Sequence, residues 1–221
     1  KREAVAIFAA FDAVSYKKLR KTCINAIIHT DNALHFDMVK DIGNAYSQVS
    51  DFCDVQSTSA DELLDIYTEN VLQKKEHIET WQQLILHLCD VSTPLKPFHV
   101  SRRWARCVQD EFFAQGDEEK RLKIPVGFLN DRDKVNRNNS EHGFIVFLVS
   151  PLTIGATKLF PMMQPLAEEM LKNVTSWRDA WVEDTKPSEE DISKKDADIQ
   201  KLKEQIAELA DRDTGATIRT R

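Results

Sequence analysis

The sequence is poor in the residues that interrupt helices. Its 221 residues include only 6 Gly and 7 Pro, and both types weaken or break a helix when they stand inside it. No alternating polar and apolar run of any length is present, so nothing indicates a half-buried β-strand. The scarcity of helix breakers and the missing strand pattern together predict an all-α protein.

Long hydrophobic runs and an excess of positive charge are also missing. No apolar stretch approaches the roughly 20 residues that a membrane span needs, so we expect no membrane span. The formal net charge of -6 is unfavourable for binding a nucleic-acid backbone, so we expect no nucleic-acid partner. The chain begins with charged residues, without Met and without a signal-peptide pattern, which favours a piece of a longer cytoplasmic protein.

Cysteines are few and scattered. Cys23, Cys53, Cys89 and Cys107 form no CxxC pair, and each stands among apolar or helical neighbours. Metal sites and redox motifs use paired cysteines at short spacings. We therefore expect buried, reduced thiols in a reducing compartment, the cytoplasm.

Apolar residues recur at helical spacing along most of the chain. Ser15 is a suitable N-cap for the first helix, Gly116 a suitable C-cap, and Pro151 a suitable helix end. Five aromatic residues are expected in the core, namely Trp104, Phe112, Phe113, Trp177 and Trp181. The pattern predicts helices at about 15–28, 32–43 or beyond, 61–72, 81–90, 98–113, 143–149 and 157–182.

The end of the chain differs in composition. After Pro187 it is highly charged, and its larger apolar residues form a heptad seam over 192–209. The sequence therefore predicts three parts, a helical domain over 1–185, a charged heptad helix over 186–211 and a disordered tail over 212–221. The seam either forms a coiled coil with a partner or a second copy of this chain, or packs back on the domain. The pattern does not separate these alternatives.

Five motifs occur in a fixed order between residues 16 and 181. The first two read Thr-Asp-Asn-Ala-Leu-His-Phe from Thr30 and His-Leu-Cys-Asp-Val-Ser-Thr-Pro-Leu-Lys from His87. The others read Asp-Glu-Phe-Phe-Ala-Gln-Gly-Asp from Asp110, Asn-Asp-Arg from Asn130 and Ser-Glu-His-Gly-Phe-Ile-Val-Phe from Ser140. Together they resemble the C-terminal half of the catalytic domain of class I 3′,5′-cyclic-nucleotide phosphodiesterases.

The resemblance implies a fold and a chemistry. The fold would be a multi-helix, HD-domain-like bundle, incomplete at its N-terminus, and the heptad pattern adds a short coiled-coil-like helix after it. The activity would be metal-dependent hydrolysis of the 3′,5′ phosphodiester of cAMP or cGMP. Family members hold two divalent metals, Zn and Mg or Mn, with two His and two Asp side chains. Two metals of this kind clamp the phosphate and activate a bridging water.

Only one position of this chain carries over as a metal ligand, Asp90. The other ligands and the proton-donating His belong to motifs that this segment lacks, so we expect no catalytic residue in it. Because each hard cation needs about six ligands, one Asp should bind metal weakly at best. The resemblance implies that His87 supports the site from behind the ligands and that Asp31 orients an upstream His. Local helix-end roles are the alternatives for Asp31 and Asp90.

The resemblance also implies a purine-binding pocket. In the family, a Phe and an aliphatic side chain sandwich the purine, and a Gln forms hydrogen bonds with its edge. Carried over, Phe144 is the stacking ring, Val108 the opposing aliphatic and Val91 the floor, with Thr93 also in the pocket. The alternative for Phe144 is packing in the core.

Glu141 stands at the position of the family's Gln. A carboxylate only accepts hydrogen bonds, whereas an amide both donates and accepts. Burial against a purine would raise the pKa of this carboxyl. Three further positions depart from the family pattern, since Thr93, Ser101 and Asn32 stand where Asn or His, Tyr and Met are usual.

Two functions are consistent with these residues. The first is a cyclic-nucleotide phosphodiesterase of which this chain is a segment. The alternative is a catalytically inactive, phosphodiesterase-like structural or interaction subunit of a larger assembly, favoured by the altered pocket and the heptad helix.

Overall fold

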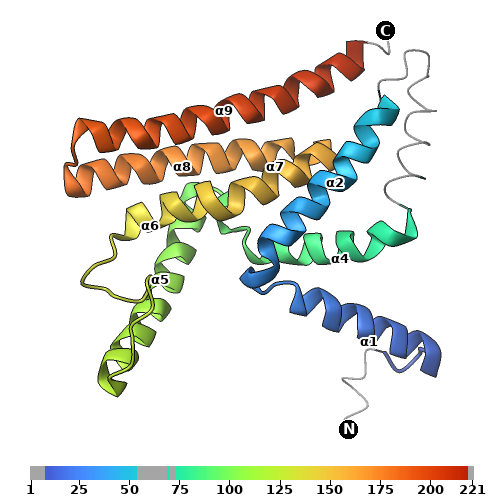
Figure 1. The fold of residues 1–221 in the computed structure, drawn as a ribbon, viewed down its shortest axis with the longest axis horizontal. Coiled ribbons are helices and arrows are strands. Elements are labelled where there is room, and N and C mark those ends of the chain that lie inside the picture. The colour runs from blue at the N-terminus through green and yellow to red at the C-terminus, as the bar shows by residue number, and fades with distance from the viewer. Residues whose placement is uncertain (1–7, 54–68, 70–72, 219–221) are drawn as a thin grey trace. The chain divides into compact units, whose positions relative to one another are not determined.

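The described chain is helical, as the composition predicts. The structure, a computed structural model, describes residues 8–53, 69 and 73–218, and these residues form no strand (Figure 1). The helix predicted over 61–72 lies outside them, apart from residue 69. The chain divides into two compact units, Lys1–Asp90 and Val91–Arg221. The all-α fold class is confirmed, while the sequence-based division at residues 185 and 211 stays a prediction.

The first unit is built around α4 (Lys75–Asp90). This helix contacts α1 (Ala13–Ile28) and α2 (His35–Cys53), and the short turn η2 (Asn32–Leu34) leads into α2. Burial of apolar area holds such helices together, at about 25 cal/mol per Å². The core of this unit includes Ala26, Met38, Ile42, Ala45, Trp81, Leu84 and Leu88.

The first helix begins earlier than the sequence predicts. Asp12 is its N-cap, because the Asp12 carboxylate accepts hydrogen bonds from the backbone N–H groups of Val14 and Ser15 at 2.8 and 3.0 Å. The predicted cap, Ser15, donates its hydroxyl to the same carboxylate at 2.6 Å. Both residue types are good caps, and the chain uses the earlier one.

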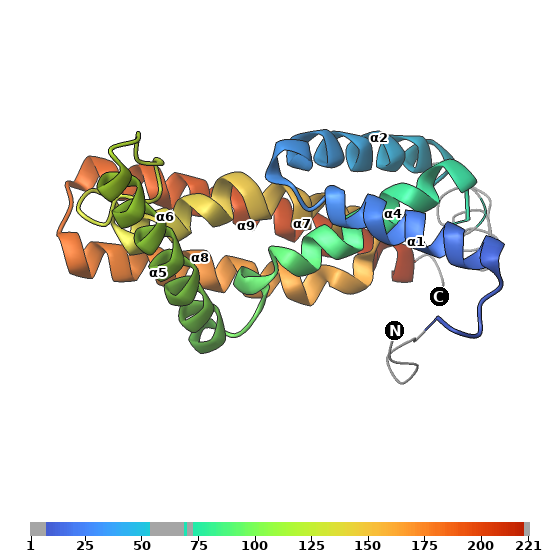
Figure 2. The same ribbon diagram turned by 90° about the horizontal axis from the view of Figure 1, so that it is seen from below.

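The second unit is built around α8 (Gln164–Thr185). This helix contacts α5 (Phe98–Leu122), α6 (Arg137–Phe144), α7 (Ser150–Leu159) and α9 (Glu189–Ile218). It also contacts three short segments, η4 (Thr93–Leu95), the π-helical η5 (Ile145–Val149) and η6 (Pro161–Met163). Met170, Val174 and Trp177 of α8 are fully buried. Figures 1 and 2 show α9 (red) lying along α8 (orange).

Three helix ends in this unit differ from the prediction. Gly116 lies inside α5, which continues to Leu122 and ends at Lys123 in a left-handed conformation with φ 58°. Pro151 lies in the first turn of α7, where its missing N–H costs little. The helix predicted over 157–182 is interrupted at Phe160, where φ is -127° and Pro161 follows.

The helical stretch Arg137–Leu159 is long and apolar enough to cross a membrane by length and composition. Of its most apolar window, 56% is buried inside the structure. The core helices of soluble proteins share these properties, so the stretch by itself does not identify a membrane protein. The expected absence of a membrane span therefore stays a prediction.

The last three residues of the predicted heptad seam are buried within the chain, whereas Ile192 and Ile199 are half-buried. Leu202, Ile206 and Leu209 of α9 are buried, and α9 contacts both α8 and α7. The Gln164 side chain donates to the Ile206 carbonyl at 3.2 Å. The structure thus favours packing back on the domain, and a coiled-coil partner or homodimer through 192–209 stays a prediction. The helix continues past residue 211 to Ile218.

Charged groups fix α9 along α8. The Arg178 guanidinium donates to the Asp196 carboxylate at 2.7 Å, and the Lys195 ammonium lies 4.7 Å from the centre of the Trp181 ring. Since both contacts join α8 to the first half of α9, they set the register of the apolar residues that follow.

Truncation of the seam should destabilise the protein. We expect Leu202→Ala to lower the free energy of unfolding by about 2–5 kcal/mol, because a buried leucine leaves a cavity. Urea denaturation at two protein concentrations measures this loss, with exposed Lys201→Ala as the matched control. A loss that grows with protein concentration would instead place the seam between chains.

Candidate functional site

A buried pair of histidines joins two helices of the first unit. His35 begins α2, His87 lies in the last turn of α4, and both are fully buried. The Nδ1 atom of His35 lies 2.8 Å from Nε2 of His87, so one ring donates a hydrogen bond to the other. Burial lowers the pKa of His87, although the nearby Asp90 carboxylate opposes this. His87 is therefore a neutral imidazole near pH 7.

His87 was predicted to support the site, whereas the sequence reasoning missed its partner. The available signal was that His35 and His87 each occupy a histidine position of the matched motifs. Residues 52 positions apart in the sequence become neighbours because α2 and α4 pack together.

The two predicted carboxylates of this unit lie at helix ends. Asp31 is exposed and caps η2, accepting a hydrogen bond from the Ala33 N–H at 2.9 Å. Asp90 is the last residue of α4 and is exposed. Asp31 thus makes a local helix-start contact, while its implied role in orienting an upstream His stays a prediction.

The residues described in this chain do not fit a two-metal centre. No group of three or more His, Cys, Asp or Glu side chains among them could hold a metal ion. Asp90 supplies a single carboxylate, whereas divalent cations need several ligands each. No catalytic step through a metal therefore follows from these residues.

Gln109 and Glu141 form a buried hydrogen bond in the second unit. Gln109 lies on α5 and Glu141 on α6, and both side chains are buried. Gln109 Nε2 donates to Glu141 Oε1 at 2.8 Å and to the carbonyl oxygen of Arg137 at 2.9 Å. The sequence singled out Glu141 but missed Gln109, because a glutamine within a helix has no distinguishing spacing.

The environment of Glu141 favours its neutral form. Burial raises the pKa of this carboxyl to about 7, despite the hydrogen bond from Gln109 and the positive charge of Arg106, which both lower it. Glu141 therefore changes its charge near neutral pH. Since a shifted pKa is typical of functional sites, Glu141 is a candidate functional residue.

A network of polar side chains supports the helix that carries Glu141. Asn138, one turn earlier on α6, accepts a hydrogen bond from Arg106 at 3.0 Å and donates to the Ala180 carbonyl at 3.2 Å. Its amide also donates to Asp184. The Arg106 guanidinium lies 5.9 Å from the centre of the buried Trp177 ring. These contacts join α5, α6 and α8, so the position of Glu141 depends on three helices.

The other predicted pocket residues differ in exposure. Phe144 is half-buried at the end of α6, Val108 is exposed on α5, Val91 is buried and Thr93 is half-buried in η4. Ser101, which replaces the family's Tyr, is buried at the start of α5. All five belong to the second unit, together with Glu141.

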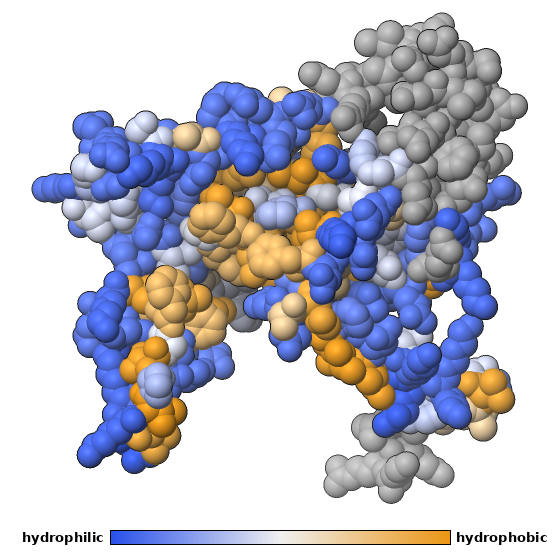
Figure 3. Space-filling model, viewed as in Figure 1, coloured by the Kyte–Doolittle hydropathy of each residue, from blue (hydrophilic) through white to orange (hydrophobic). Residues whose placement is uncertain are grey.

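Part of the predicted aromatic core lies at the surface. Phe113, Trp177 and Trp181 are buried as predicted, whereas Trp104 and Phe112 are 53% and 38% exposed. Positions 104, 108 and 112 share one face of α5, because they are spaced by four residues. Figure 3 shows hydrophobic surface in orange over α5 and the loop after it. The apolar face of α5 is therefore exposed in the described structure.

The prediction of buried cysteines was wrong for the three that the structure describes as free thiols. Cys23, Cys89 and Cys107 are exposed, because each lies on a side of its helix that faces away from the buried core. The side chain of Cys53 lies outside the described residues.

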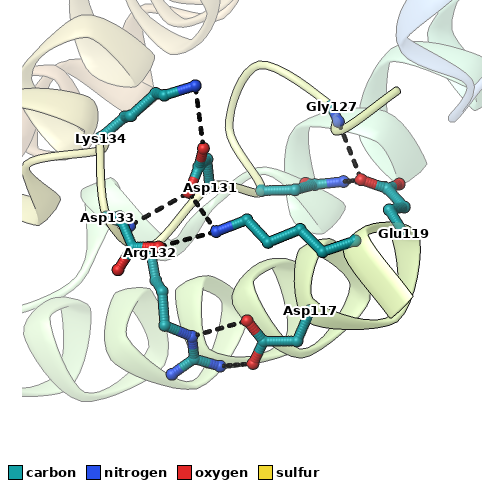
Figure 4. Close-up of polar contacts among 9 residues, drawn as sticks. Asp117, Glu119, Gly127, Asp131, Arg132, Asp133 and Lys134 are labelled. Atoms are coloured by element: carbon teal, nitrogen blue, oxygen red, sulfur yellow. Dashed lines mark hydrogen bonds and ion pairs between the residues drawn. The ribbon is translucent and has the colours of Figure 1, made fainter. Parts of the chain in front are cut away.

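The loop 123–136 between α5 and α6 is anchored to the end of α5 (Figure 4). The Glu119 carboxylate accepts hydrogen bonds from the Gly127 N–H at 2.8 Å and from the Asn130 side chain at 3.0 Å. A Cβ on Gly116 would lie only 2.0 Å from the Asn130 carbonyl oxygen. Gly116 therefore allows a close approach of the loop and is not a helix cap.

Three ion pairs complete this anchor (Figure 4). Lys120 binds Asp131 at 2.7 Å and Asp133 at 2.8 Å, and its hydrogen bond lowers the pKa of Asp131 to about 2. Arg132 donates to Asp117 at 3.0 Å. Residues of two sequence motifs thus meet here and hold the loop.

The chain is similar to known enzymes of one class. Residues 1–170 match the family model described as 3′5′-cyclic nucleotide phosphodiesterase. The chain is 29% identical over 181 residues to human high affinity cGMP-specific 3′,5′-cyclic phosphodiesterase 9A, covering 80% of this chain and 26% of that protein. It is 31% identical over 154 residues to the probable 3′,5′-cyclic phosphodiesterase pde-1 of Caenorhabditis elegans, covering 68% of this chain and 19% of that protein.

A third relative and one solved structure agree with these. Human dual specificity calcium/calmodulin-dependent 3′,5′-cyclic nucleotide phosphodiesterase 1B is 31% identical over 171 residues, covering 76% of this chain and 27% of that protein. The fold resembles that of LmjPDEB1 in complex with IBMX, with a TM-score of 0.65 and 22% identity over 81% of this chain and 48% of that one.

The matched model and the helical architecture define a helical phosphodiesterase-type fold. The chain belongs to the 3′,5′-cyclic nucleotide phosphodiesterase family. It spans about a quarter of the length of the curated relatives, with 26% of the human 9A protein covered.

The close approach at Gly116 can be tested by adding a methyl group. We expect Gly116→Ala to lower the free energy of unfolding by about 1–3 kcal/mol, because backbone atoms of Asn130 must move. The matched control is Gly43→Ala in α2, where an added Cβ would meet no atom within 4 Å apart from its chain neighbours and its own helix backbone. This control should raise stability by about 0.5–1 kcal/mol. Equal effects of the two substitutions in urea denaturation would contradict the packing described.

The raised pKa of Glu141 predicts the sign of a stability change with pH. The folded chain binds this proton more tightly than the unfolded chain, so the stabilisation is present below about pH 4.5 and is lost as pH rises through about 7. Glu141→Gln removes this loss. We expect the free energy of unfolding of Glu141→Gln, relative to the parent protein, to increase from about pH 5 to about pH 8.

Glu118→Gln is a control of opposite sign. The hydrogen bond from Arg121 lowers the pKa of Glu118, so that carboxylate contributes stability above its unfolded pKa and loses it at lower pH. Glu118→Gln should therefore lose stability relative to the parent protein as pH rises towards about 4.5, and should gain none between about pH 5 and 8. A change of the same sign in both variants would contradict the environment assigned to Glu141.

Proposed function

We propose that this chain forms the base-recognition part of a cyclic-nucleotide phosphodiesterase, which hydrolyses the 3′,5′ phosphodiester of cAMP or cGMP. The observation that carries the proposal is the buried hydrogen bond between Gln109 and Glu141, since Glu141 stands at the position of the family's base-contacting Gln. Family membership supports the substrate class.

The hydrolytic chemistry would need two divalent metals, Zn and Mg or Mn. In this proposal Asp90 contributes one ligand, and the remaining His and Asp ligands come from motifs that this segment lacks. When bound, the metals would supply Lewis acidity and an activated water. The residues described here would bind and orient the base, with Phe144 stacking on it and Val108 on its other face.

The residues that depart from the family pattern favour a second function. With Glu141, Thr93, Ser101 and Asn32 at pocket positions, an inactive phosphodiesterase-like subunit of a larger cytoplasmic assembly would retain its core while its pocket changed. Metal analysis of the protein isolated from its natural source separates the two proposals. About two metals per chain would exclude the inactive subunit, and their absence together with absent nucleotide binding would exclude the enzyme.

Base recognition predicts the effect of two substitutions on cAMP binding at about pH 8. We expect Glu141→Gln to tighten binding about tenfold, because an amide can donate to the purine acceptor that a carboxylate leaves unpaired. We expect Phe144→Ala to weaken binding by roughly tenfold, a typical effect of losing a base–aromatic stack. Isothermal titration calorimetry on the whole chain measures both.

The matched control for Phe144→Ala is Phe11→Ala, an exposed phenylalanine in the first unit. This control should leave the affinity for cAMP unchanged. If Glu141→Gln and Phe144→Ala behave like the control, the base does not bind at these residues.

A further inference from the structure

The orientation of the Gln109 amide is fixed by its two hydrogen-bond partners. Gln109 Nε2 donates to the Arg137 carbonyl at 2.9 Å and to Glu141 Oε1 at 2.8 Å. A carbonyl oxygen only accepts, so turning the amide over would place two acceptors against each other. Gln109 Oε1 is buried and has no hydrogen-bond partner in the described structure, so nothing there stabilises the reversed orientation.

This fixed amide distinguishes the two oxygens of Glu141. Oε1 accepts from Gln109 in either charge state, so the proton of the neutral acid is expected on Oε2. The ionised group then presents only acceptors to a bound base. The neutral group presents a donor at Oε2 and retains acceptor capacity at Oε1.

The two charge states fit different bases. The edge of guanine carries neighbouring N–H donors at N1 and the 2-amino group, which match an ionised carboxylate. The edge of adenine carries an amino donor beside the N1 acceptor, and this alternation matches a neutral carboxylic acid. An ionised carboxylate would instead place an acceptor against the acceptor of adenine, which costs binding free energy.

We infer that Gln109 and Glu141 act together as a protonation-dependent selector of the base, with ionised Glu141 favouring cGMP and neutral Glu141 favouring cAMP. Gln109 is a positioning residue in this selector, because it acts through Glu141 and does not itself contact the base. The inference rests on the proposed function, since it requires a purine to bind at Glu141.

The charged groups around Glu141 leave it as the group that titrates near pH 7. Arg106 on α5 and Arg137 on α6 are guanidinium groups that stay charged. Asp184 on α8 binds Asn138 and interacts with Arg106. The neighbouring His142 is buried next to Lys195 of α9, and burial lowers its pKa to about 4. His142 is therefore neutral throughout the range in which Glu141 changes charge.

The test is calorimetric titration of the whole chain with cAMP and cGMP, at about one pH unit below and one above the pKa of about 7. Apparent affinity scales with the fraction of protein in the competent state. We therefore expect the affinity for cGMP to rise by roughly tenfold across this range, and the affinity for cAMP to fall by roughly tenfold.

Three variants separate positioning from general structural support. Glu141→Gln should abolish the opposite pH trends. Gln109→Leu removes a hydrogen bond that lowers the pKa of Glu141, so the crossover should move to higher pH. The matched control is Gln115→Leu, which removes an exposed Gln–Glu hydrogen bond on the same helix and should leave the crossover in place.

Each outcome decides between the inferences. Opposite pH trends that move in Gln109→Leu support the selector. Binding of both nucleotides at a constant affinity ratio overturns the selector but leaves the proposed function intact. Equal weakening of both nucleotides in Gln109→Leu, with an unmoved crossover, reduces Gln109 to a structural role. Absence of binding at either pH overturns both the selector and the proposed function.

Discussion

The second unit depends on the burial of one face of α8. Met170, Val174 and Trp177 on that face are fully buried, and the helices that carry the candidate site pack around it. Buried polar groups on α8 fix the direction of these contacts. Asn173 donates to the carbonyl oxygens of Pro94 and Lys96 at 2.6 and 2.7 Å. These two hydrogen bonds attach the segment before α5 to α8. Hydrophobic burial alone would not specify where along α8 this segment packs.

The same packing explains why Glu141 is poised between two charge states. Removing a carboxylate from water costs several kcal/mol unless it is well paired. Gln109 is a neutral donor, and a hydrogen bond to a charged group contributes about 1.5–3 kcal/mol. Arg106 adds a favourable charge, but it also binds Asn138. Desolvation therefore exceeds the compensation, and the pKa rises.

The neighbouring His142 has the opposite response to the same environment. Burial disfavours the charged form of any group, so it raises the pKa of an acid and lowers that of a base. Glu141 shifts to about 7 and His142 to about 4. Between about pH 4.5 and 6.5, their contributions to the pH dependence of stability have opposite signs and partly cancel. A nearly flat stability profile would therefore conceal two strongly perturbed groups.

The sequence predicted the positions of the helices better than their ends. Periodicity located most helices, because one buried face repeats at helical spacing. Helix ends were less predictable, as Gly116 and Pro151 show. Gly116 is required by the close approach of Asn130, which lies in the loop after α5, and Pro151 occupies a first turn, where proline is tolerated. Neither fact is encoded in the neighbouring residues.

The residues of the candidate site were also predicted only in part. Motifs identified Glu141 and His87, because residue type and order carry that information. Their partners, Gln109 and His35, depend on the packing of two helices and could not be read from spacing alone. The exposure of Trp104 was also missed. An aromatic residue at helical spacing is usually expected in the core, and the sequence does not show which faces of its helix other elements cover.

The residues predicted to contact the base and the predicted metal ligand belong to different units of the chain. All predicted base contacts, including Glu141 and Phe144, belong to the second unit, whereas Asp90 ends the first. In the proposed function, base binding would require no metal ligand, because Val108 lies on α5 and both Glu141 and Phe144 lie on α6. Loss of hydrolysis would therefore not imply loss of base selectivity. A member of this family that cannot complete a metal centre could still distinguish guanine from adenine, and its binding preference would follow the charge of one buried carboxyl group.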